Sequence, residues 1–183
     1  MSILNIRTIG DPVLRESSRD VETFDDLLRR LRDDMLETMY NAPGVGLAAP
    51  QIGLALRFFV YDPGDGSGPG AVANPVLSEF DGELLEDEGC LSIQGLWYPT
   101  PRATRIRVSG QDIDGEPISL VAEALLARIF QHETDHVNGT LFIDRLAPED
   151  RKRALGELRE RELDLHPEPK PDPAGLRRVT GRP

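Results

Sequence analysis

The sequence is poor in cysteine, in basic residues and in long apolar runs, and each shortage excludes a class of protein. It has 183 residues and a single cysteine, so an internal disulfide and a zinc site built from several cysteines are both excluded. Lys and Arg number 21 against 32 Asp and Glu, a net charge of −11. That balance argues against a protein that binds nucleic acid mainly by neutralising phosphates. No run approaches the roughly 18 apolar residues of a membrane span, so we expect no membrane protein.

The first residues also lack the features of a targeting sequence. Residues 1–7 contain no basic stretch followed by an apolar one, and they are not rich in arginine and serine. We therefore expect the protein to remain in the cytoplasm, and the lone cysteine fits such a reducing compartment. A chain of this length makes about one domain, which we assign to residues 1–165. Five of the last eighteen residues are proline, so we expect residues 166–183 to form a disordered tail.

Apolar spacing predicts three helices in the domain. Apolar residues recur every three or four positions over residues 24–40, 123–137 and 148–165. Short strands are predicted at residues 56–61, 71–74, 76–80, 82–86, 105–111 and 117–121. Strands that come before a central helix, with no internal repeat, indicate one α+β domain. We expect short antiparallel strands packed around that central helix, with one helix N-terminal and one C-terminal to it.

The central helix carries the pattern H-E-x-x-H, at His132, Glu133 and His136. Residues four apart lie on one face of a helix, so both imidazoles can bind a single metal ion. Glu133 can then accept or donate the protons of a metal-activated water. Two of the three histidines in the chain fall at this spacing on an apolar helix face, which favours a metal site over coincidence. The sequence thus predicts a central metal-binding helix.

A catalytic metal usually has three protein ligands and a water, so a third ligand must come from elsewhere. One familiar zinc-protease pattern places another histidine six residues after the second, and here that position is Phe142. Spacing alone leaves several candidates open: Cys90, the carboxylates of Asp144, Glu149 and Glu157, and His166 in the tail. A zinc-dependent protease or aminopeptidase with a Glu ligand is therefore the competing interpretation.

A stretch of small residues precedes the predicted strands, with the sequence GVGLAAPQ at Gly44–Gln51. Glycine and alanine at such density allow another group to approach the backbone closely. The amide of Gln51 can donate a hydrogen bond to an oxyanion. The stretch is equally typical of a packed turn.

Three segments in this order resemble the motifs of the peptide deformylase family: Gly44–Gln51, EGCLS at residues 88–92 and QHETDH at residues 131–136. The resemblance extends from about residue 10 to about residue 146. It implies one divalent metal ion bound by Cys90, His132 and His136, with Fe²⁺ as the first choice and Zn²⁺ or another divalent ion as alternatives. The implied substrate is the N-formyl-methionine end of a nascent polypeptide, which is hydrolysed to formate and a free amine.

The resemblance also implies roles for further residues. Glu133 would act as the base, while the Gln51 amide and the backbone N–H of Leu91 would bind the oxyanion. Val45, Leu125 and Ile129 would form an apolar pocket for the methionine side chain. The peptide backbone would run beside Gly46 and Gly89.

Two positions near these motifs carry further expectations. Arg102 is expected to orient the histidines by pairing with Glu88 or Asp135, although it is equally compatible with an ordinary surface ion pair. Ala124 stands where a glycine often precedes the helix in this family.

The family resemblance also implies a contact with the ribosome through the C-terminal region. Basic residues occur at 151–153 on the third predicted helix, and the tail carries four basic and two acidic residues, a charge of +2. A solvated helix face explains the first group as well. We expect no direct recognition of nucleic acid by residues 1–165.

Overall fold

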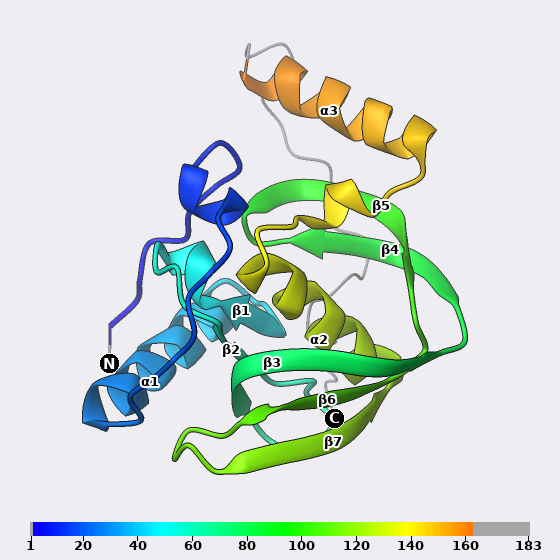
Figure 1. Cartoon of the computed structure of the whole chain (residues 1–183). Helices are drawn as coiled ribbons and strands as arrows, with labels where there is room; N and C mark the ends of the chain where they lie inside the picture. The colour runs from blue at the N-terminus through cyan, green and yellow to red at the C-terminus, as the bar shows by residue number, and fades with distance from the viewer. Residues whose placement is uncertain (1, 163–183) are drawn as a thin grey trace, which may run out of the picture.

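The computed structural model describes residues 2–162, which are arranged around one buried helix (Figure 1). The helices are α1 (Asp26–Asn41), α2 (Ala124–Val137) and α3 (Pro148–Glu162), with short 3-10 helices at Pro12–Arg15, Ala49–Ile52 and Phe142–Asp144. The strands are β1 (Gly46–Ala48), β2 (Phe58–Tyr61), β3 (Gly70–Asp81), β4 (Leu84–Cys90), β5 (Ile93–Arg102), β6 (Arg105–Gln111) and β7 (Pro117–Glu123). The predicted α+β class is confirmed.

The strands form two antiparallel sheets. Five strands pair in the order β1-β2-β3-β6-β7, and β4 pairs with β5 in a separate two-stranded sheet. Figure 1 shows α2 between the five-stranded sheet and the β4–β5 pair. Within the described part of the chain β4 has only this one partner, so its other edge is unpaired.

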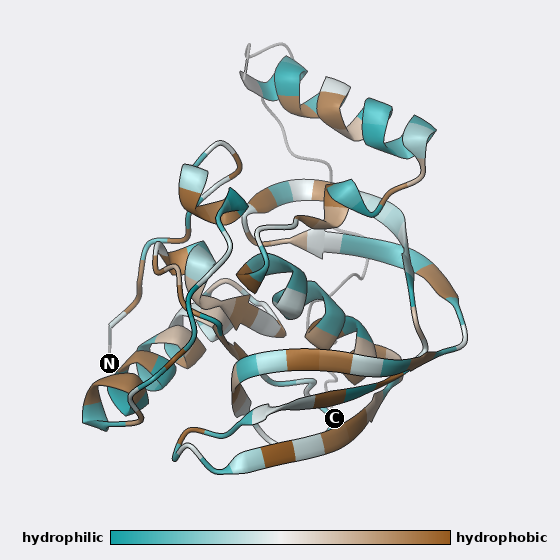
Figure 2. Cartoon of the chain, in the orientation of Figure 1, coloured by the Kyte–Doolittle hydropathy of each residue, from teal (hydrophilic) through white to brown (hydrophobic). Residues whose placement is uncertain are grey.

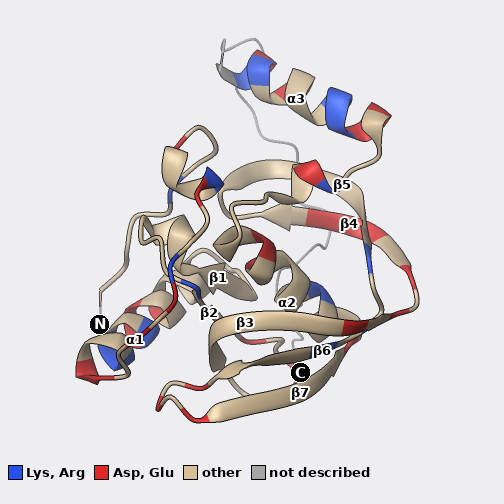
Figure 3. Cartoon of the chain, in the orientation of Figure 1, with Lys and Arg blue, Asp and Glu red and all other residues tan. Residues whose placement is uncertain are grey.

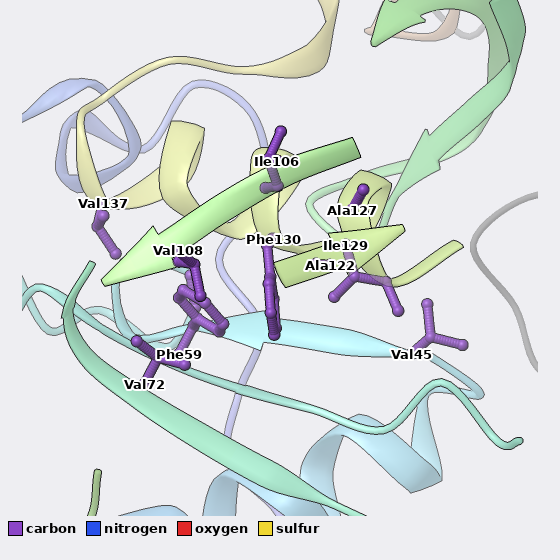
Figure 4. Close-up of a cluster of buried hydrophobic side chains, with 11 residues drawn as sticks. Val45, Phe59, Val72, Ile106, Val108, Ala122, Ala127, Ile129, Phe130 and Val137 are labelled. Atoms are coloured by element: carbon purple, nitrogen blue, oxygen red, sulfur yellow. The ribbon is translucent and has the colours of Figure 1, made fainter. Parts of the chain in front are cut away.

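Apolar side chains fix α2 against the larger sheet. Every residue of α2 from Ala127 to Val137 is buried, and Ile129 and Phe130 pack in one cluster with side chains of the sheet (Figure 4). The Phe130 ring centroid lies 5.6 Å from that of Phe59 and 4.7 Å from that of Tyr61. Burial of each large apolar side chain contributes about 1.5–3 kcal/mol, so the helix is held in one position and rotation.

The first helix begins two residues later than its apolar spacing predicts. The side chain of Asp25 accepts hydrogen bonds from the backbone N–H groups of Leu27 and Leu28, which makes it the N-cap. Met35 and Met39 are fully buried against β1 and β2, and hydrophilic and hydrophobic residues alternate along the helix (Figure 2). The helix thus supports the small-residue strand β1.

The two strands predicted at residues 71–74 and 76–80 are one continuous strand, so their separation was wrong. Pro75 lies inside β3, where it interrupts the pairing with β6. Asn74 and Glu79 have positive φ angles of 52° and 50° and mark the two irregularities in register. A bulge accommodates a proline within a strand because no ladder hydrogen bond is required there.

The strand predicted at residues 82–86 was also placed wrongly. Gly82 has a φ of 67° and forms the turn after β3, and β4 then runs from Leu84 to Cys90. Strands β1 and β5 were not predicted. β5 contains Pro99 and Pro101, and a strand at the edge of a sheet tolerates proline because its outer side needs no donor.

The third helix packs on the β4–β5 pair. Ala154 is fully buried, the Tyr98 hydroxyl donates to Glu157 at 2.7 Å, and Arg161 donates to the carbonyl oxygens of Gln94 and Gly95. The predicted end of this helix at residue 165 and the predicted tail at 166–183 lie outside the described residues. No helix in residues 2–162 is long and apolar enough to cross a membrane.

Candidate metal centre and active site

His132 and His136 lie one turn apart on α2, and Cys90 lies beside them at the end of β4. The two Nε2 atoms are 3.2 Å apart, and the Sγ atom of Cys90 is 3.2 Å from Nε2 of His136. Metal–nitrogen bonds of about 2.0–2.1 Å and a metal–sulfur bond of about 2.3 Å separate tetrahedral donor atoms by roughly 3.3–3.7 Å. The three donor atoms all lie within 4.8 Å of one another and could hold one divalent ion.

The other candidates for the third ligand have different contacts. Asp144 pairs with Arg15 and Arg151, and Glu157 accepts from Tyr98. The Phe142 ring is stacked on His132, with centroids 6.5 Å apart. Glu149 lies in the first turn of α3, and His166 is outside the described residues. Among the described residues, the only group that could hold a metal ion contains Cys90 and no carboxylate.

Glu88 orients the first histidine. Its Oε1 atom lies 2.6 Å from Nδ1 of His132, and its side chain is completely buried. Burial alone would raise the pKa of Glu88, but the charge of Arg102 and the hydrogen bonds with His132 and Arg102 outweigh it and lower the pKa from 4.5 to about 2. The ionised carboxylate accepts a hydrogen bond from the Nδ1–H group of His132, which leaves Nε2 free to bind a metal.

Arg102 links the carboxylate of Glu88 to that of Asp135. Its Nε and Nη2 atoms donate to the two carboxylate oxygens of Glu88 at 2.9 and 2.5 Å, and Nη1 donates to Asp135 at 2.7 Å. Arg145 binds the same Asp135 carboxylate. The expectation that Arg102 pairs near the histidines is confirmed, with Glu88 and Asp135 both as partners and the guanidinium buried.

Gln51 presents its amide nitrogen to the thiol. The Oε1 atom accepts from the backbone N–H of Ala48 at 2.8 Å, so Nε2 faces Cys90 Sγ at 3.6 Å and Ser92 Oγ at 3.2 Å. The backbone N–H of Ser92 also donates to Cys90 Sγ at 3.4 Å. The sulfur of Cys90 thus accepts from the Gln51 amide and from the Ser92 backbone N–H. Leu91 follows in the turn between β4 and β5.

Glu133 faces the backbone of β1. Gly46 has no side chain, and the carboxylate of Glu133 occupies the space beside it. A Cβ atom at residue 46 would lie only 2.3 Å from Oε1 of Glu133. Burial raises the pKa of Glu133 from 4.5 to about 7. Its Oε2 atom is buried without a hydrogen-bond partner among the described residues. A carboxylate with these properties can exchange a proton near neutral pH.

Three of the expected substrate-binding residues share one apolar cluster. Val45 and Ile129 are buried in one cluster, and the half-buried Leu125 packs against it. Gly89 precedes Cys90, and a Cβ atom there would lie 2.7 Å from the ring of Trp97. The backbone of β4 next to the thiol is therefore packed on its Trp97 side.

Sequence reasoning missed two contacts of the site. It did not predict the direct bond between Glu88 and His132 or the role of Ser92 beside Gln51. The first had a signal in the sequence, because residues two apart in a regular strand are expected on the same side, although the strand is irregular between Glu88 and Cys90. The position of Ser92 beside Gln51 depends on the turn after β4, and nothing in the sequence indicated it.

A buried H-E-x-x-H helix with a cysteine as third donor and a carboxylate of raised pKa defines a metal-dependent hydrolase. Comparison with known proteins identifies the family within this class of hydrolases. The profile of the polypeptide deformylase family matches residues 3–152, and the chain belongs to this family.

Individual relatives agree with the family assignment. The peptide deformylase of Acidothermus cellulolyticus is 53% identical over 162 residues, which covers 88% of this chain and 89% of that protein. The crystal structure of the Thermus thermophilus peptide deformylase superposes with a TM-score of 0.83 at 46% identity, covering 88% of this chain and 96% of that one. The Synechococcus elongatus peptide deformylase, solved in complex with actinonin, gives a TM-score of 0.80 at 40% identity and covers 85% and 87% of the two chains.

Proposed function

We propose that this protein is a metal-dependent hydrolase that removes the formyl group from N-formyl-methionine at the start of nascent polypeptides. The observation that supports this most strongly is the group of donor atoms from Cys90, His132 and His136 on a helix that also carries the buried Glu133, in a chain of the polypeptide deformylase family. The strands surround a central helix that provides the base and two of the three ligands.

The metal would be held by Cys90, His132 and His136. When bound, a divalent ion supplies Lewis-acid activation of water and of the formyl oxygen. A mixed thiolate and imidazole set suits several ions, and we propose Fe²⁺, with Zn²⁺ or another divalent ion as the alternative. Glu88 fixes the ring of His132 by its bond to Nδ1.

The residues of the chain then handle protons and charge. Glu133 accepts a proton from the attacking water, whose oxygen forms a bond to the formyl carbon. The oxygen of the formyl group gains negative charge, and the Gln51 amide and the backbone N–H of Leu91 donate hydrogen bonds to it. The carbon–nitrogen bond breaks, and Glu133 passes the proton to the departing amine nitrogen. The products are formate and the free amino terminus.

The methionine side chain would bind at Val45, Leu125 and Ile129. The half-buried Leu125 is the accessible member of this set, since Val45 and Ile129 are buried. The peptide backbone would run beside Gly46 and Gly89, whose Cα atoms are packed against Glu133 and Trp97, respectively. The unpaired edge of β4 offers backbone groups that an extended peptide can bind.

A zinc protease or aminopeptidase is the alternative function, and it predicts that Cys90 is dispensable. Cys90→Ser separates the two interpretations, because only the deformylase requires the thiolate. We expect this variant to lose metal and formate release together. Retention of both would favour the protease. Ser78→Ala, on the exposed part of β3, provides the control for substitution as such.

We further propose that residues 1–165 form the catalytic unit, that the protein acts in the cytoplasm and that its C-terminal region contacts the ribosome. Exposed basic groups on α3 support the last point, although Arg151 and Arg153 are paired with Asp144 and Asp150. Ribosome co-sedimentation of the whole chain and of a chain ending at residue 165 tests the contribution of the tail. Equal co-sedimentation would exclude the tail as the contact.

The experiment that tests the function is anaerobic purification with metal analysis, followed by measurement of formate released from a formyl-Met tripeptide. The peptide without the formyl group is the control for proteolysis. One divalent ion per chain and formate from the formylated peptide alone are expected. Cleavage of a peptide bond in the control would contradict the proposal.

A further inference from the structure

A cavity of about 640 Å³ lies beside α2, on the side of the helix away from the metal centre. Thr134 contributes to its lining and is two residues from both His132 and His136. At about 100° per residue, Thr134 lies roughly 160° around the helix axis from either histidine. Cavities of about 300–1,000 Å³ bind small molecules. This cavity is therefore separate from the active site and large enough for a ligand of its own.

Part of the lining is apolar and accessible. Val76 and Phe80 of β3 contribute to it, and each is 59% exposed. Figure 2 shows hydrophobic residues along this strand. An apolar group that covers these side chains removes apolar area from water, which favours its binding.

The charged part of the lining is basic. It contains the guanidinium groups of Arg57, Arg102 and Arg145 against the carboxylates of Glu83 and Asp135, a net charge of +1. The whole chain carries −11, and acidic residues are spread along α1 and β4 (Figure 3). A positive cavity in a negative protein favours a ligand with a single negative charge.

Arg145 is the guanidinium that a ligand can reach. Its side chain is 50% exposed, compared with 18% for Arg57 and 4% for Arg102. Its Nε and Nη2 atoms donate to Asp135, and no hydrogen bond within residues 2–162 involves its Nη1 atom. A guanidinium binds a carboxylate through two parallel N–H groups. The edge formed by Nη1 and Nη2 can therefore bind a second carboxylate while Nε and Nη2 keep Asp135.

We infer that this cavity binds a small molecule with one carboxylate and a linear apolar chain, such as the anion of a medium-chain fatty acid. Arg145 would bind the carboxylate, and Val76 and Phe80 would cover the chain. Asp135 also accepts from Arg102, so the ligand would contact the charged residues that orient the metal ligands without entering the active site. The inference goes beyond the proposed function and does not depend on it.

The test is the binding of octanoate to the zinc-loaded full chain, measured by calorimetry and by NMR shifts of backbone amides. The amides of Val76 and Phe80 should shift, and that of Gly46 beside Glu133 should not. Butanoate should bind at least about tenfold more weakly, because each buried CH₂ group contributes up to about fourfold in affinity. Octanamide has the same length and no charge, and it should bind about fivefold more weakly.

Variants separate the two parts of the ligand. Phe80→Ala, at an exposed side chain, should weaken octanoate more than butanoate. Arg145→Gln should remove the difference between octanoate and octanamide. Because Arg145 also binds Asp135, Phe80→Asp repeats the test of charge at an exposed position: octanoate should then bind more weakly than octanamide. Leu155→Ala is the matched control, since Leu155 is an exposed apolar residue on α3 outside the lining.

A bound metal ion also attracts carboxylates, so the active site is the competing location. Octanoate bound there would shift the amide of Gly46 and would be lost in Cys90→Ser, whereas binding in the cavity should be unchanged in that variant. Loss in Cys90→Ser with retention in Phe80→Asp would overturn the inference, as would equal affinity for octanamide or no binding at all. Formate release from a formyl-Met tripeptide, measured on the same protein, tests the proposed function separately. A chain that releases formate and does not bind octanoate contradicts only this inference.

Discussion

The carboxylate of Glu133 lies against the backbone of Gly46, so that a Cβ atom at residue 46 would be only 2.3 Å from its Oε1 atom. The two residues come from different elements, since Gly46 begins β1 and Glu133 lies in the middle of α2. The position of Glu133, the proposed base, is therefore set by the absence of a side chain on a neighbouring strand.

Gly46→Ala should displace the carboxylate without removing any metal ligand. A misplacement of about 1 Å can lower the rate by about 100-fold, so we expect a loss of that size in kcat. Metal content, measured by elemental analysis, should stay at one ion per chain. An unchanged kcat would show that the contact does not position the base.

Arg102→Lys should weaken metal binding. Lysine cannot bind both oxygens of Glu88 and also reach Asp135, so the carboxylate that holds His132 loses its fixed position. Loss of such an orienting contact reduces metal affinity by about 10–100-fold, measured here by competition with a chelator. Arg107→Lys is the control, because Arg107 pairs with Glu79 in an exposed ion pair. Equal affinities for the two variants would contradict the role of Arg102.

Ala124→Gly should stabilise the protein. Ala124 has a φ of 48°, a left-handed conformation that costs a non-glycine residue about 1–2 kcal/mol. Relief of this strain, less the entropy that glycine adds to the unfolded chain, leaves a gain of about 0.5–1 kcal/mol, or a rise of about 1–4 °C in Tm. Ala127→Gly, inside the same helix, should lower Tm. A lower Tm for Ala124→Gly would show that the left-handed conformation carries no strain.

The parts of the fold that could be predicted from sequence are those with regular apolar spacing. The helices around Met35 and around Ile129 have a clear period and were located to within two residues. Strand β5 was missed because it contains Pro99 and Pro101, and β1 was missed because its three residues show no alternation. The position of Ala124 was noticed from the family resemblance, and the structure gives the physical reason in its positive φ.

The residues of the site also differ in how well they could be predicted from the sequence. Residues close in sequence, such as His132 and His136, follow from helical spacing alone. Cys90 could not be chosen by spacing, because its distance to the histidines depends on the path of β4 and β5 between them. Contacts across elements, such as Gly46 with Glu133, required coordinates.

The most direct test of the central claim is formate release by Glu133→Ala in parallel with metal analysis. Glu133 touches none of the proposed ligand atoms through a hydrogen bond, so the variant should bind one divalent ion per chain as the unaltered protein does. Without the proton acceptor, formate release from a formyl-Met tripeptide should be abolished. Near-normal turnover in a metal-loaded variant would contradict the assignment of Glu133 as the base.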